Sequence, residues 1–351
     1  MNHKLNSLQA GRGLAAIAVL LCHIPLIFGP FPQEFGGLVS AGSRGVDFFF
    51  VLSGFIIFYT NRTIIGVPAA APFYFYRRVV RIWPLLAVFT VVKLFYMLAG
   101  GEVPEHKLSF SYVVTSTLLF PQTQPPFLQV SWTLSFEMFF YSIFLLAILY
   151  GKSMRVVCMI HAALCLLLNL SPLAPGDYPV SFLFSPYIPE FYAGSVIAWF
   201  YLDVKRAIGR WPATGCLLGG VAILVVGVCG QQVVESVLPN CQQLFWGTGV
   251  GLAIFGAIPL ERAGLLRVPA WMVFLGDASY SIYLAHTSIQ QVLKAVLSRC
   301  GFIGAAHPQL CLWLVASLSL GLCLVVYVLI EQPLLRWFHE RGPRKYRASG
   351  V

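Results

Sequence analysis

Long apolar runs alternate with short polar or Pro- and Gly-containing breaks along almost the whole chain. A helix needs about 20 apolar residues to cross the hydrocarbon core of a bilayer, and ten runs approach or reach that length. They lie near residues 8–28, 46–61, 79–98, 133–150, 155–171, 182–202, 212–230, 241–260, 273–297 and 309–331. The run at 46–61 is short for a span, which predicts a tilted or extended helix there. The pattern predicts an all-α fold, a polytopic integral membrane bundle of about ten transmembrane helices.

The charges between these runs predict how the chain crosses the membrane. Lys and Arg concentrate in the cytoplasmic loops of membrane proteins. With the N-terminus in the cytoplasm, eighteen Lys and Arg residues fall in cytoplasmic segments, and only Arg44, Lys107 and Arg299 fall on the opposite side. We therefore predict an even number of spans with both termini cytoplasmic. Residues 1–338 form the predicted transmembrane domain, and residues 339–351 form a short basic cytoplasmic tail.

The composition agrees with a membrane protein and removes other classes. Of the 351 residues, 58% are hydrophobic and only 10% are charged, against about 25% charged residues in soluble domains. The mean hydropathy is +0.79. So few polar residues cannot cover a soluble fold, which excludes a soluble globular enzyme, a disordered chain and a disulfide scaffold. Topology explains the net charge of +10, so we expect a lipid bilayer and no nucleic acid as a partner. The nine Cys residues lack metal-ligand spacing, so no metal is expected.

Ionisable residues inside the predicted spans are the first candidates for function, because a charge in hydrocarbon is costly. Arg12 and His23 are eleven positions apart in the first span. Eleven helical residues turn through about 1100°, within about 20° of three full turns, so both side chains share one face about 16 Å apart along the axis. This geometry suits a ligand whose anionic part lies at the cytoplasmic mouth while its reactive end reaches His23. The alternative is a snorkelling Arg and a hydrogen-bonded core His.

A basic cluster begins the third span. Arg77, Arg78 and Arg81 stand before Trp83 and Pro84, and Arg78 and Arg81 are neighbours on a helix face. Planar guanidinium groups bind phosphate well. The cluster therefore suits a phosphate site, whereas its charge alone favours an ordinary positive anchor at the membrane surface.

Candidate acids at or inside the predicted spans include Asp47, Glu137 and Glu331. Asp47 has a possible structural partner in Arg44, and Glu331 has one in Arg336. Glu137 has no base close to it in the sequence, so it is the acid for which we most expect a functional role.

The span at 273–297 carries several polar residues. Asp277 stands near its start, where an acid can cap a helix, and Tyr280, Tyr283 and His286 follow at three-residue steps along one side. This arrangement makes Tyr280 and His286 candidates for contact with a substrate or for support of its site.

Taken in order, these motifs resemble those of the acyltransferase family 3 membrane proteins, which O-acylate bacterial surface glycans and other acceptors. No single motif is decisive, but the ordered set covers nearly the whole chain. The opening motif and the lack of an appended domain are most similar to the exopolysaccharide-production branch of that family. The matching stretches are LQAGRGLAA (8–16) with His23, GVDFFFVLSGF (45–55), RRVVRIWP (77–84), SWTLSFEMFFY (131–141), SYSIYLAH (279–286) and EQP (331–333).

The resemblance implies a fold, a location and a donor. It implies about ten helices in the bacterial inner membrane and an acyl-CoA donor, usually acetyl-CoA, used from the cytoplasm. The family's Arg-x10-His pattern, which is tied to activity, falls on Arg12 and His23. Its Arg-x-x-Arg pattern falls on Arg78 and Arg81, and its acid before Pro falls on Glu331. Some relatives carry a C-terminal periplasmic hydrolase-like domain. Without one, this chain would acylate its acceptor directly or depend on a separate partner.

Acyl transfer to a hydroxyl needs a base, a stabilised oxyanion and the exclusion of water. We expect His23 to be the general base, with Glu137 or Glu331 orienting its ring. Glu331 lies near the end of its span, so it would reach His23 only through a tilted or broken helix. A covalent acyl-His intermediate is a variant. The arginines of the two family patterns would bind the phosphates of acyl-CoA. Hydroxyl or indole donors and other support would come from Asp47, Ser53, Trp132, Tyr141, Tyr280 and His286.

Other functions fit part of the pattern. A transporter or flippase for a lipid-linked glycan, without acyl-transfer activity, would also place ionisable groups around a polar cavity, although the chain shows no paired interrupted spans. A purely structural subunit would not need charges this deep. The expected partners are acyl-CoA and a glycan or lipid-linked saccharide acceptor, with a homo-oligomer or a separate periplasmic partner left open. The acceptor and the length of the acyl group also stay open.

Overall fold

Every regular element in the described part of the chain is helical. The computed structural model describes residues 5–29, 37, 39–100, 109–171, 176–204, 208–301 and 308–343, and these contain no strand. The α-helices are α1 (Asn6–Phe28), α3 (Gly45–Asn61), α4 (Ala71–Leu98), α5 (Phe110–Thr117), α6 (Trp132–Tyr150), α7 (Ser153–Leu170), α8 (Val180–Leu183), α9 (Ile188–Trp199), α10 (Arg210–Cys229), α11 (Gln231–Val237), α12 (Gln242–Arg262), α13 (Ala270–Asp277), α14 (Ser279–Arg299), α15 (Pro308–Val326) and α16 (Gln332–Arg341). Short helical turns of other pitch are η1 (Gly42–Arg44), η2 (Arg62–Ile64), η3 (Pro68–Ala70), η5 (Gln129–Ser131), η6 (Phe200–Val204) and η7 (Tyr327–Glu331).

Eight helical stretches within the described ranges are long and apolar enough to cross a membrane. They correspond to eight of the ten predicted spans, and the all-helical fold is confirmed. They are Asn6–Phe28, Val39–Ile64, Pro68–Leu98, Gln129–Tyr150, Ser153–Leu170, Arg210–Cys229, Gln242–Arg262 and Cys311–Arg341. The short run at 46–61 lies within the 26-residue stretch Val39–Ile64, so the expected extension of this helix is present. The total of ten spans and the side on which the termini lie stay predictions.

The other two predicted spans contain shorter or more polar helices. The run at 182–202 holds α8, α9 and η6. The run at 273–297 holds α13 and α14, and α14 packs inside the bundle against α1, α4 and α15. Because α14 faces protein rather than lipid, it can carry polar side chains that would be costly against hydrocarbon. Its buried polar residues are Ser279, Ser281, His286, Ser288 and Gln290.

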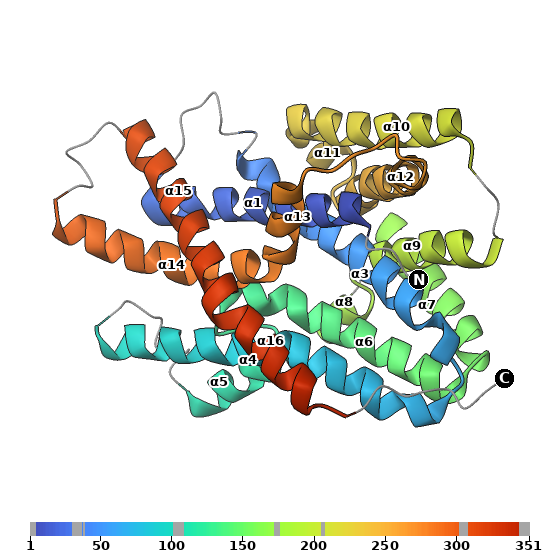
Figure 1. Ribbon diagram of the computed structural model, residues 1–351, viewed down its shortest axis with the longest axis horizontal. Helices are drawn as coiled ribbons and strands as arrows, with labels where there is room; N and C mark the ends of the chain where they lie inside the picture. Colours follow the sequence, from blue (N-terminus) through green and yellow to red (C-terminus); the bar gives the residue numbers. More distant parts are fainter. Residues whose placement is uncertain are drawn as a thin grey trace.

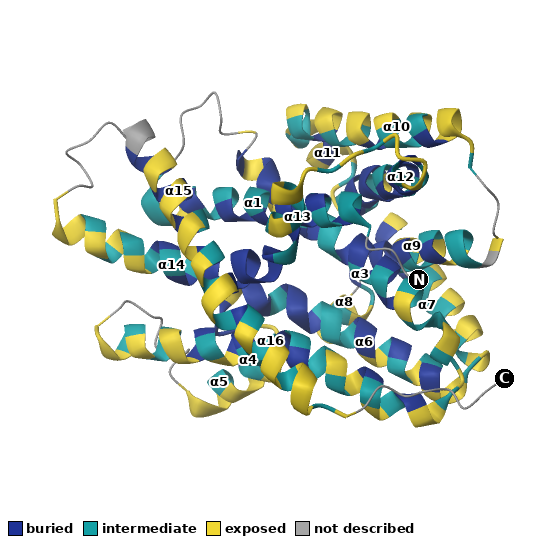
Figure 2. Cartoon of the chain, in the orientation of Figure 1, coloured by how far each residue is buried: buried dark blue, intermediate teal, exposed yellow. Residues whose placement is uncertain are grey.

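The bundle has a buried centre and an apolar outer surface. Most of the long helices run along the horizontal axis of Figure 1. Buried residues gather in α3, α12 and the first part of α14, whereas α7 and α10 are largely exposed (Figure 2). Leucines such as Leu167 and Leu218 are exposed on those two helices. An exposed apolar surface of this kind is the surface that a bilayer covers.

Two glycines bring α3 and α9 into backbone contact. A Cβ atom built at Gly54 would lie 1.9 Å from the carbonyl oxygen of Phe191, and one built at Gly194 would lie 1.8 Å from the carbonyl oxygen of Val51. Small residues allow such close approach between membrane helices. The contact sets the distance between two helices that each carry an acid in the first turn, Asp47 in α3 and Glu190 in α9.

A carboxylate from α12 closes the N-terminal turn of α1, which has no capping side chain of its own. Glu261 accepts hydrogen bonds from the main-chain N–H of Asn6 (2.6 Å), from the main-chain N–H of Ser7 (2.9 Å) and from the Ser7 hydroxyl. A carboxylate in this position pairs free N–H groups and complements the helix dipole. Glu261 thereby fixes the start of the helix that carries the Arg-x10-His pattern.

Several helix ends meet at the end of the bundle where α1 begins. Arg262 at the end of α12 donates to the hydroxyl of Tyr59 near the end of α3 (3.2 Å). Tyr76 near the start of α4 donates to the carbonyl oxygen of Phe338 near the end of α16 (2.7 Å). Both ends of the described chain therefore lie at one end of the bundle, here termed the basic end. The Lys and Arg residues that define it are Arg62, Arg77, Lys152, Arg155, Arg262, Arg336 and Arg341.

Candidate active site

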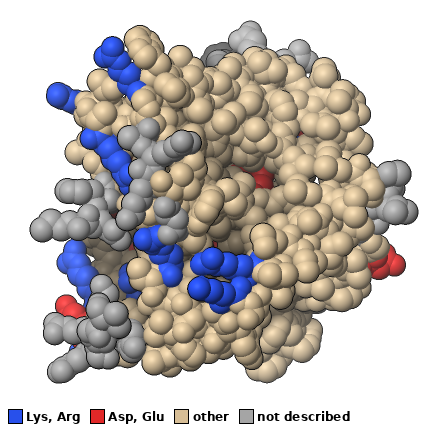
Figure 3. Space-filling model, turned by 90° about the vertical axis from the view of Figure 1, so that its right-hand side faces the viewer, with Lys and Arg blue, Asp and Glu red and all other residues tan. Residues whose placement is uncertain are grey.

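A cavity of about 370 Å³ lies between α1, α3, α4, α6, α14 and α16. Thr60, Arg77 and His339 line it near the basic end, and Val46 and Phe49 line it deeper in the bundle. Figure 3 looks onto the right-hand end of Figure 1 and shows Lys and Arg side chains gathered over one part of that face. The cavity therefore connects the basic end with the interior of the bundle.

Four arginines line this cavity: Arg12 from α1, and Arg77, Arg78 and Arg81 from α4. Arg12 is buried, and the guanidinium of Arg78 lies 5.0 Å from the ring centroid of Tyr141. Among the described residues, no carboxylate comes within salt-bridge distance of these four side chains. Their positive charge is open to an anionic ligand. The structure thus brings together the three arginines that the sequence patterns selected.

Glu137 is the acid that lines the cavity. Its Oε1 accepts hydrogen bonds from the Ser53 hydroxyl on α3 (3.3 Å) and from the Tyr141 hydroxyl one turn along α6. Its charge also acts on Arg12 and Arg81 at longer range. Three predicted site residues, Ser53, Glu137 and Tyr141, therefore meet on one wall of the cavity.

Glu331 lies among the arginines and not beside His23. It is buried and accepts a hydrogen bond from the Ser281 hydroxyl at the start of α14 (2.5 Å). Its negative charge acts on Arg12 and Arg81. Glu331 therefore lies near the arginines of the site. No hydrogen bond among the described residues joins it to His23.

The helix that carries Glu331 changes its winding without breaking. α15 continues through η7, a π-helical segment, into α16. A π-helical turn holds an extra residue and rotates the side chains around it relative to a regular helix. Arg336, the alternative partner of Glu331, instead donates to Gln332 (3.5 Å). The helix therefore changes pitch before Gln332 and Pro333 and does not break there.

His23 and His286 meet where α1 packs against α14, with ring centroids 4.9 Å apart and ring planes at 67°. His23 Nδ1 lies 2.8 Å from the carbonyl oxygen of Val19, and His286 Nδ1 lies 3.0 Å from that of Ile282. A carbonyl oxygen only accepts, so each Nδ1 carries the hydrogen, and each neutral ring keeps a lone pair on Nε2. Nε2 of His286 is buried and has no hydrogen-bond partner among the described residues.

Tyr283 connects the cavity with the histidine pair. It lines the cavity, and its ring centroid lies 6.2 Å from that of His286. Its hydroxyl contacts the Thr133 hydroxyl (2.8 Å) and donates to the carbonyl oxygen of Val130 (3.0 Å). His23 does not itself line the cavity. The path of contacts from the cavity to His23 runs through Tyr283 and His286.

Three other predicted residues occupy different surroundings. Tyr280 lines the cavity, but its hydroxyl donates to the carbonyl oxygen of Ile82 (2.8 Å). Trp132 packs against Phe50 and does not line the cavity. Asp47 is buried and also lies outside the lining. Of these three, only Tyr280 is placed to touch a ligand in the cavity, through its ring.

Two acids with structural importance, Glu190 and Glu261, are not among the residues predicted from the sequence. Glu190 is buried beside Asp47. It stands inside the predicted span 182–202, so an acid within an apolar run was the signal that could have found it. Glu261 ends an apolar run next to Arg262, and it caps a helix start 255 positions away. Nothing local in the sequence marks that role.

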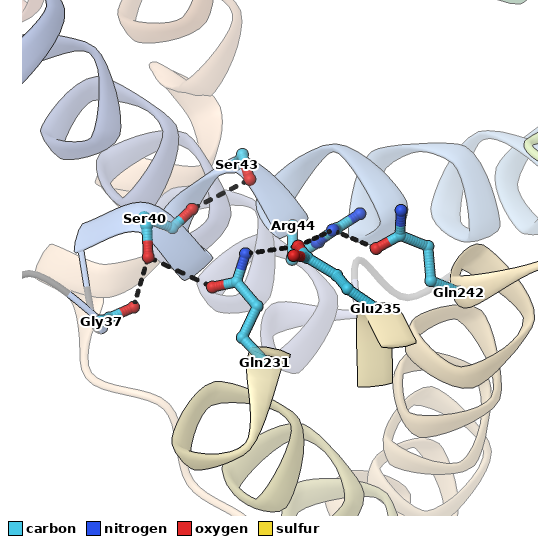
Figure 4. A network of polar contacts seen from close by, with 7 residues as sticks. All are labelled: Gly37, Ser40, Ser43, Arg44, Gln231, Glu235 and Gln242. Carbon is cyan, nitrogen blue, oxygen red and sulfur yellow. Dashed lines mark hydrogen bonds and ion pairs between the residues drawn. The ribbon is translucent and has the colours of Figure 1, made fainter. Parts of the chain in front are cut away.

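Arg44 ends η1 just before α3 and contacts α11 and the start of α12 (Figure 4). Because α3 and α12 both end at the basic end, their starts lie at the opposite end of the bundle, here termed the outer end. In the described residues it forms its ion pair with Glu235, with 3.3 Å between Nη2 and Oε1, and it also donates to Gln242. Gln231 donates to the same oxygen of Glu235 (2.9 Å). The structural partner of Arg44 is therefore Glu235 rather than Asp47.

Comparison with known proteins places the chain in a family. A family model described as an acyltransferase domain, the third acyltransferase family, matches residues 5–330. The chain is 33% identical over 331 residues to the exopolysaccharide production protein ExoZ of Rhizobium meliloti, which covers 91% of this chain and 96% of that protein. It is 25% identical over 381 residues to the acyltransferase MdmB of Streptomyces mycarofaciens, covering 97% and 94%. No solved structure matches the chain.

The family match spans the elements that build the site. The cavity arginines, Glu137 and both histidines all lie between residues 5 and 330. The match and the ExoZ relative agree with the motifs that the sequence shares with the family. This membrane protein therefore belongs to acyltransferase family 3.

Proposed function

We propose that the chain is an integral O-acyltransferase of the bacterial inner membrane. It would transfer an acyl group, most simply acetyl, from acyl-CoA to a hydroxyl of an extracytoplasmic or lipid-linked glycan such as an exopolysaccharide. Family membership supports acyl transfer, and the name of the ExoZ relative supports an exopolysaccharide acceptor. The observation that carries the proposal is one cavity in which, among the described residues, four guanidinium groups form no salt bridge, and from which contacts lead through Tyr283 to two histidines.

The arginines would bind the phosphates of acyl-CoA. A guanidinium fork donates two parallel hydrogen bonds to a phosphate, and it stays charged inside a membrane protein. Arg77 stands nearest to the basic end, and the deeper cavity is lined by apolar residues such as Val46 and Phe49. This gradient suits a donor whose phosphates stay near the cytoplasmic mouth while its thioester arm extends inward.

His23 would act as the general base through Nε2. The acceptor hydroxyl would give its proton to Nε2 as its oxygen attacks the thioester carbonyl. The C–S bond then breaks, and the imidazolium returns the proton to the departing thiolate of CoA. The carbonyl of Val19 holds Nδ1–H, and so it takes the orienting part that a carboxylate has in a triad. His286 offers a second basic nitrogen beside the imidazolium that forms.

Glu137 and Glu331 would balance the arginines. Their charges act on Arg12 and Arg81 from two different elements, Glu137 on α6 and Glu331 at the end of η7. Several guanidinium groups in one membrane cavity would repel one another without nearby acids. The two carboxylates would therefore keep the arginines in place until the phosphates of the donor arrive.

A covalent variant uses the same nitrogen. Nε2 of His23 would attack the thioester carbonyl, CoA thiolate would leave, and the acceptor hydroxyl would then attack the acylimidazole. Rapid acid quenching after mixing with radiolabelled acetyl-CoA, without acceptor, separates the two routes. A labelled peptide that contains His23 supports the covalent route, and its absence during steady turnover supports direct transfer.

The test is CoA release from acetyl-CoA by detergent-purified protein, measured by chromatography, with and without a crude cell-envelope glycan. Wild type should release CoA in a glycan-dependent way. His23→Ala should lower the rate by at least about 100-fold, because a positioned general base contributes about that much. His161→Ala is the matched control, since His161 contacts Tyr192 and the carbonyl of Leu183 on the other side of α6 from the cavity lining.

Two results would contradict the proposal. Normal glycan-dependent release by His23→Ala would end the role of His23. No release and no acetyl-CoA binding by folded wild-type protein would remove acyl-CoA as the donor and favour the glycan transporter.

A further inference from the structure

Three polar side chains of α6 lie on the cavity wall at successive turns of the helix. Thr133, Glu137 and Tyr141 are four residues apart, and all three line the cavity. α6 ends at the basic end, because Lys152 and Arg155 of that end follow its last residue. At 1.5 Å per residue, Thr133 stands about 12 Å farther from the basic end than Tyr141. Thr133 is therefore the deepest polar side chain that α6 supplies to the cavity.

This depth suits the reactive end of the donor. The guanidinium of Arg78 lies 5.0 Å from the ring centroid of Tyr141, so under the proposed function the phosphates of acyl-CoA bind near the level of Tyr141. The arm of the donor then extends along α6 toward Thr133. Beside Thr133 stands Tyr283, whose ring centroid lies 6.2 Å from that of His286. The thioester would thus reach Thr133 in the part of the cavity that leads to the histidine pair.

The hydroxyl groups of Thr133 and Tyr283 lie 2.8 Å apart and share one carbonyl oxygen. Tyr283 donates to the carbonyl oxygen of Val130 at 3.0 Å, and the same oxygen lies 3.3 Å from the Thr133 hydroxyl. The hydrogen of Thr133 therefore has two acceptors here, the phenol oxygen and a carbonyl that already accepts a shorter bond. A threonine hydroxyl rotates to suit its acceptor. Thr133 can turn its hydrogen toward a ligand oxygen while Tyr283 keeps its own bond.

Acyl transfer needs a donor of this kind. In the direct route and in the covalent route, a nucleophile adds to the thioester carbonyl carbon, and one electron pair of the C=O bond moves onto the oxygen. The pair returns when the C–S bond breaks, and the thiolate of CoA takes its proton from the imidazolium. Hydrogen-bond donors fixed beside that oxygen stabilise its charge. Thr133 also stands in the first turn of α6, where the positive end of the helix dipole favours a negative charge.

We propose that Thr133 stabilises the oxyanion of the tetrahedral intermediate. Its hydroxyl donates a hydrogen bond to the thioester oxygen and keeps its proton throughout. Tyr283 is a positioning residue, because it holds the Thr133 oxygen without touching the reacting atoms. The assignment rests on the proposed function and adds two residues to it, both outside the set predicted from the sequence.

Initial rates of glycan-dependent CoA release test the donor. Thr133→Val keeps the shape of the side chain but removes the hydroxyl, and it should lower kcat about 100-fold, the usual effect of losing one oxyanion donor. The KM for acetyl-CoA and the Kd of CoA should not change, because the bond strengthens only as charge develops. Thr133→Ser keeps a hydroxyl and should recover most of the lost kcat.

Thr90→Val is the matched control for the loss of a buried hydroxyl. Thr90 and Thr133 are both 7% exposed. The Thr90 hydroxyl donates to the carbonyl oxygen of Leu86 (2.9 Å), and Thr90 does not line the cavity. Its replacement should leave kcat unchanged.

A double variant tests the positioning role of Tyr283. Tyr283→Phe should lower kcat up to about tenfold, since it removes one neutral hydrogen bond to Thr133. Adding Tyr283→Phe to Thr133→Val should cause no further loss, because residues that act as one unit are not additive. A separate structural defect at Tyr283 would instead multiply the two losses.

Each outcome decides the proposal. A kcat of Thr133→Val close to that of wild type, a loss confined to KM or CoA binding, or a Thr133→Ser variant as slow as Thr133→Val overturns it. Multiplied losses in the double variant overturn the positioning role of Tyr283. If Thr133→Val no longer binds CoA, Thr133→Ala is judged by the same change in kcat. Wild-type protein that releases no CoA removes the proposed function and this role together, whereas normal release by Thr133→Val removes only the role of Thr133.

Discussion

Replacing Gly54 by Ala should separate α3 from α9. The added Cβ would lie 1.9 Å from the carbonyl oxygen of Phe191, whereas real Cβ atoms essentially never approach closer than 3.0 Å. Both partners are helical backbone, so no flexible side chain can move aside, and the helices must shift apart by more than about 1 Å. Overpacking of this kind costs about 1–3 kcal/mol, and the rigid contact places the expected loss near 3 kcal/mol.

Gly219→Ala is the matched control for this change. Gly219 lies inside α10, and a Cβ built there meets nothing within 4 Å. The same substitution should therefore be neutral or should stabilise by up to about 1 kcal/mol through helix propensity. Comparing the two variants separates the effect of the close contact from the effect of an extra methyl group in a membrane helix.

Thermal unfolding in detergent, followed by size-exclusion chromatography with fluorescence detection, measures the difference. A loss of about 3 kcal/mol should lower the apparent melting temperature of Gly54→Ala by roughly 6 °C. CoA release should fall as well, because α3 carries Ser53 on the cavity wall. If Gly54→Ala and Gly219→Ala melt within 1 °C of each other, the backbone contact is absent and the placement of Asp47 beside Glu190 is wrong.

Three further predictions concern the Glu261 cap on α1, Arg81 in the cavity and His286 beside His23. Glu261→Ala should destabilise the protein by about 1–2 kcal/mol in a thermal unfolding assay, since α1 loses its capping carboxylate. Glu261→Gln should have a smaller effect, because its amide oxygen still accepts a hydrogen bond. Arg81→Lys should raise the KM for acyl-CoA about tenfold in initial-rate assays without changing the melting temperature, because an ammonium lacks the guanidinium fork. His286→Phe should lower kcat at least tenfold with the KM for acyl-CoA unchanged, because the ring still fills the space beside His23 but no longer supplies a basic nitrogen.

Each of these predictions has a result that contradicts it. If Glu261→Ala melts at the same temperature as the wild-type protein, the cap on α1 contributes nothing to stability. An unchanged KM for Arg81→Lys would remove that side chain from the phosphate site. A kcat of His286→Phe close to that of wild type, with normal folding, would make His286 a packing residue.

The sequence predicts the helices and several of the side chains that line the cavity. Span length and apolar content are local properties, so eight runs reappear as long apolar helices. Arg12, Arg78, Arg81 and Glu137 converge because charged side chains in apolar helices must turn away from lipid and toward one another. The direction of these side chains follows from helix periodicity, which the sequence contains.

The sequence does not predict which residues become neighbours across helices. The order of helices around the bundle decides that His23 meets His286 rather than an acid, and that Asp47 meets Glu190. The π-helical turn that directs Glu331 toward Ser281 depends on packing against α14. α14 itself lies below the hydropathy of a typical span because it is enclosed by other helices.

The cap on α1 also sets an order of events during synthesis. Asn6 and Glu261 are 255 positions apart, so at about 5–20 residues per second the carboxylate is made roughly 13–50 s after the helix start. During that interval α1 has uncapped N–H groups at the basic end, and the wall that Arg12 contributes to the cavity is not yet fixed. A nascent chain would therefore contain His23 long before it has a finished acyl-CoA site. Partly made chains on ribosomes would not hydrolyse the donor.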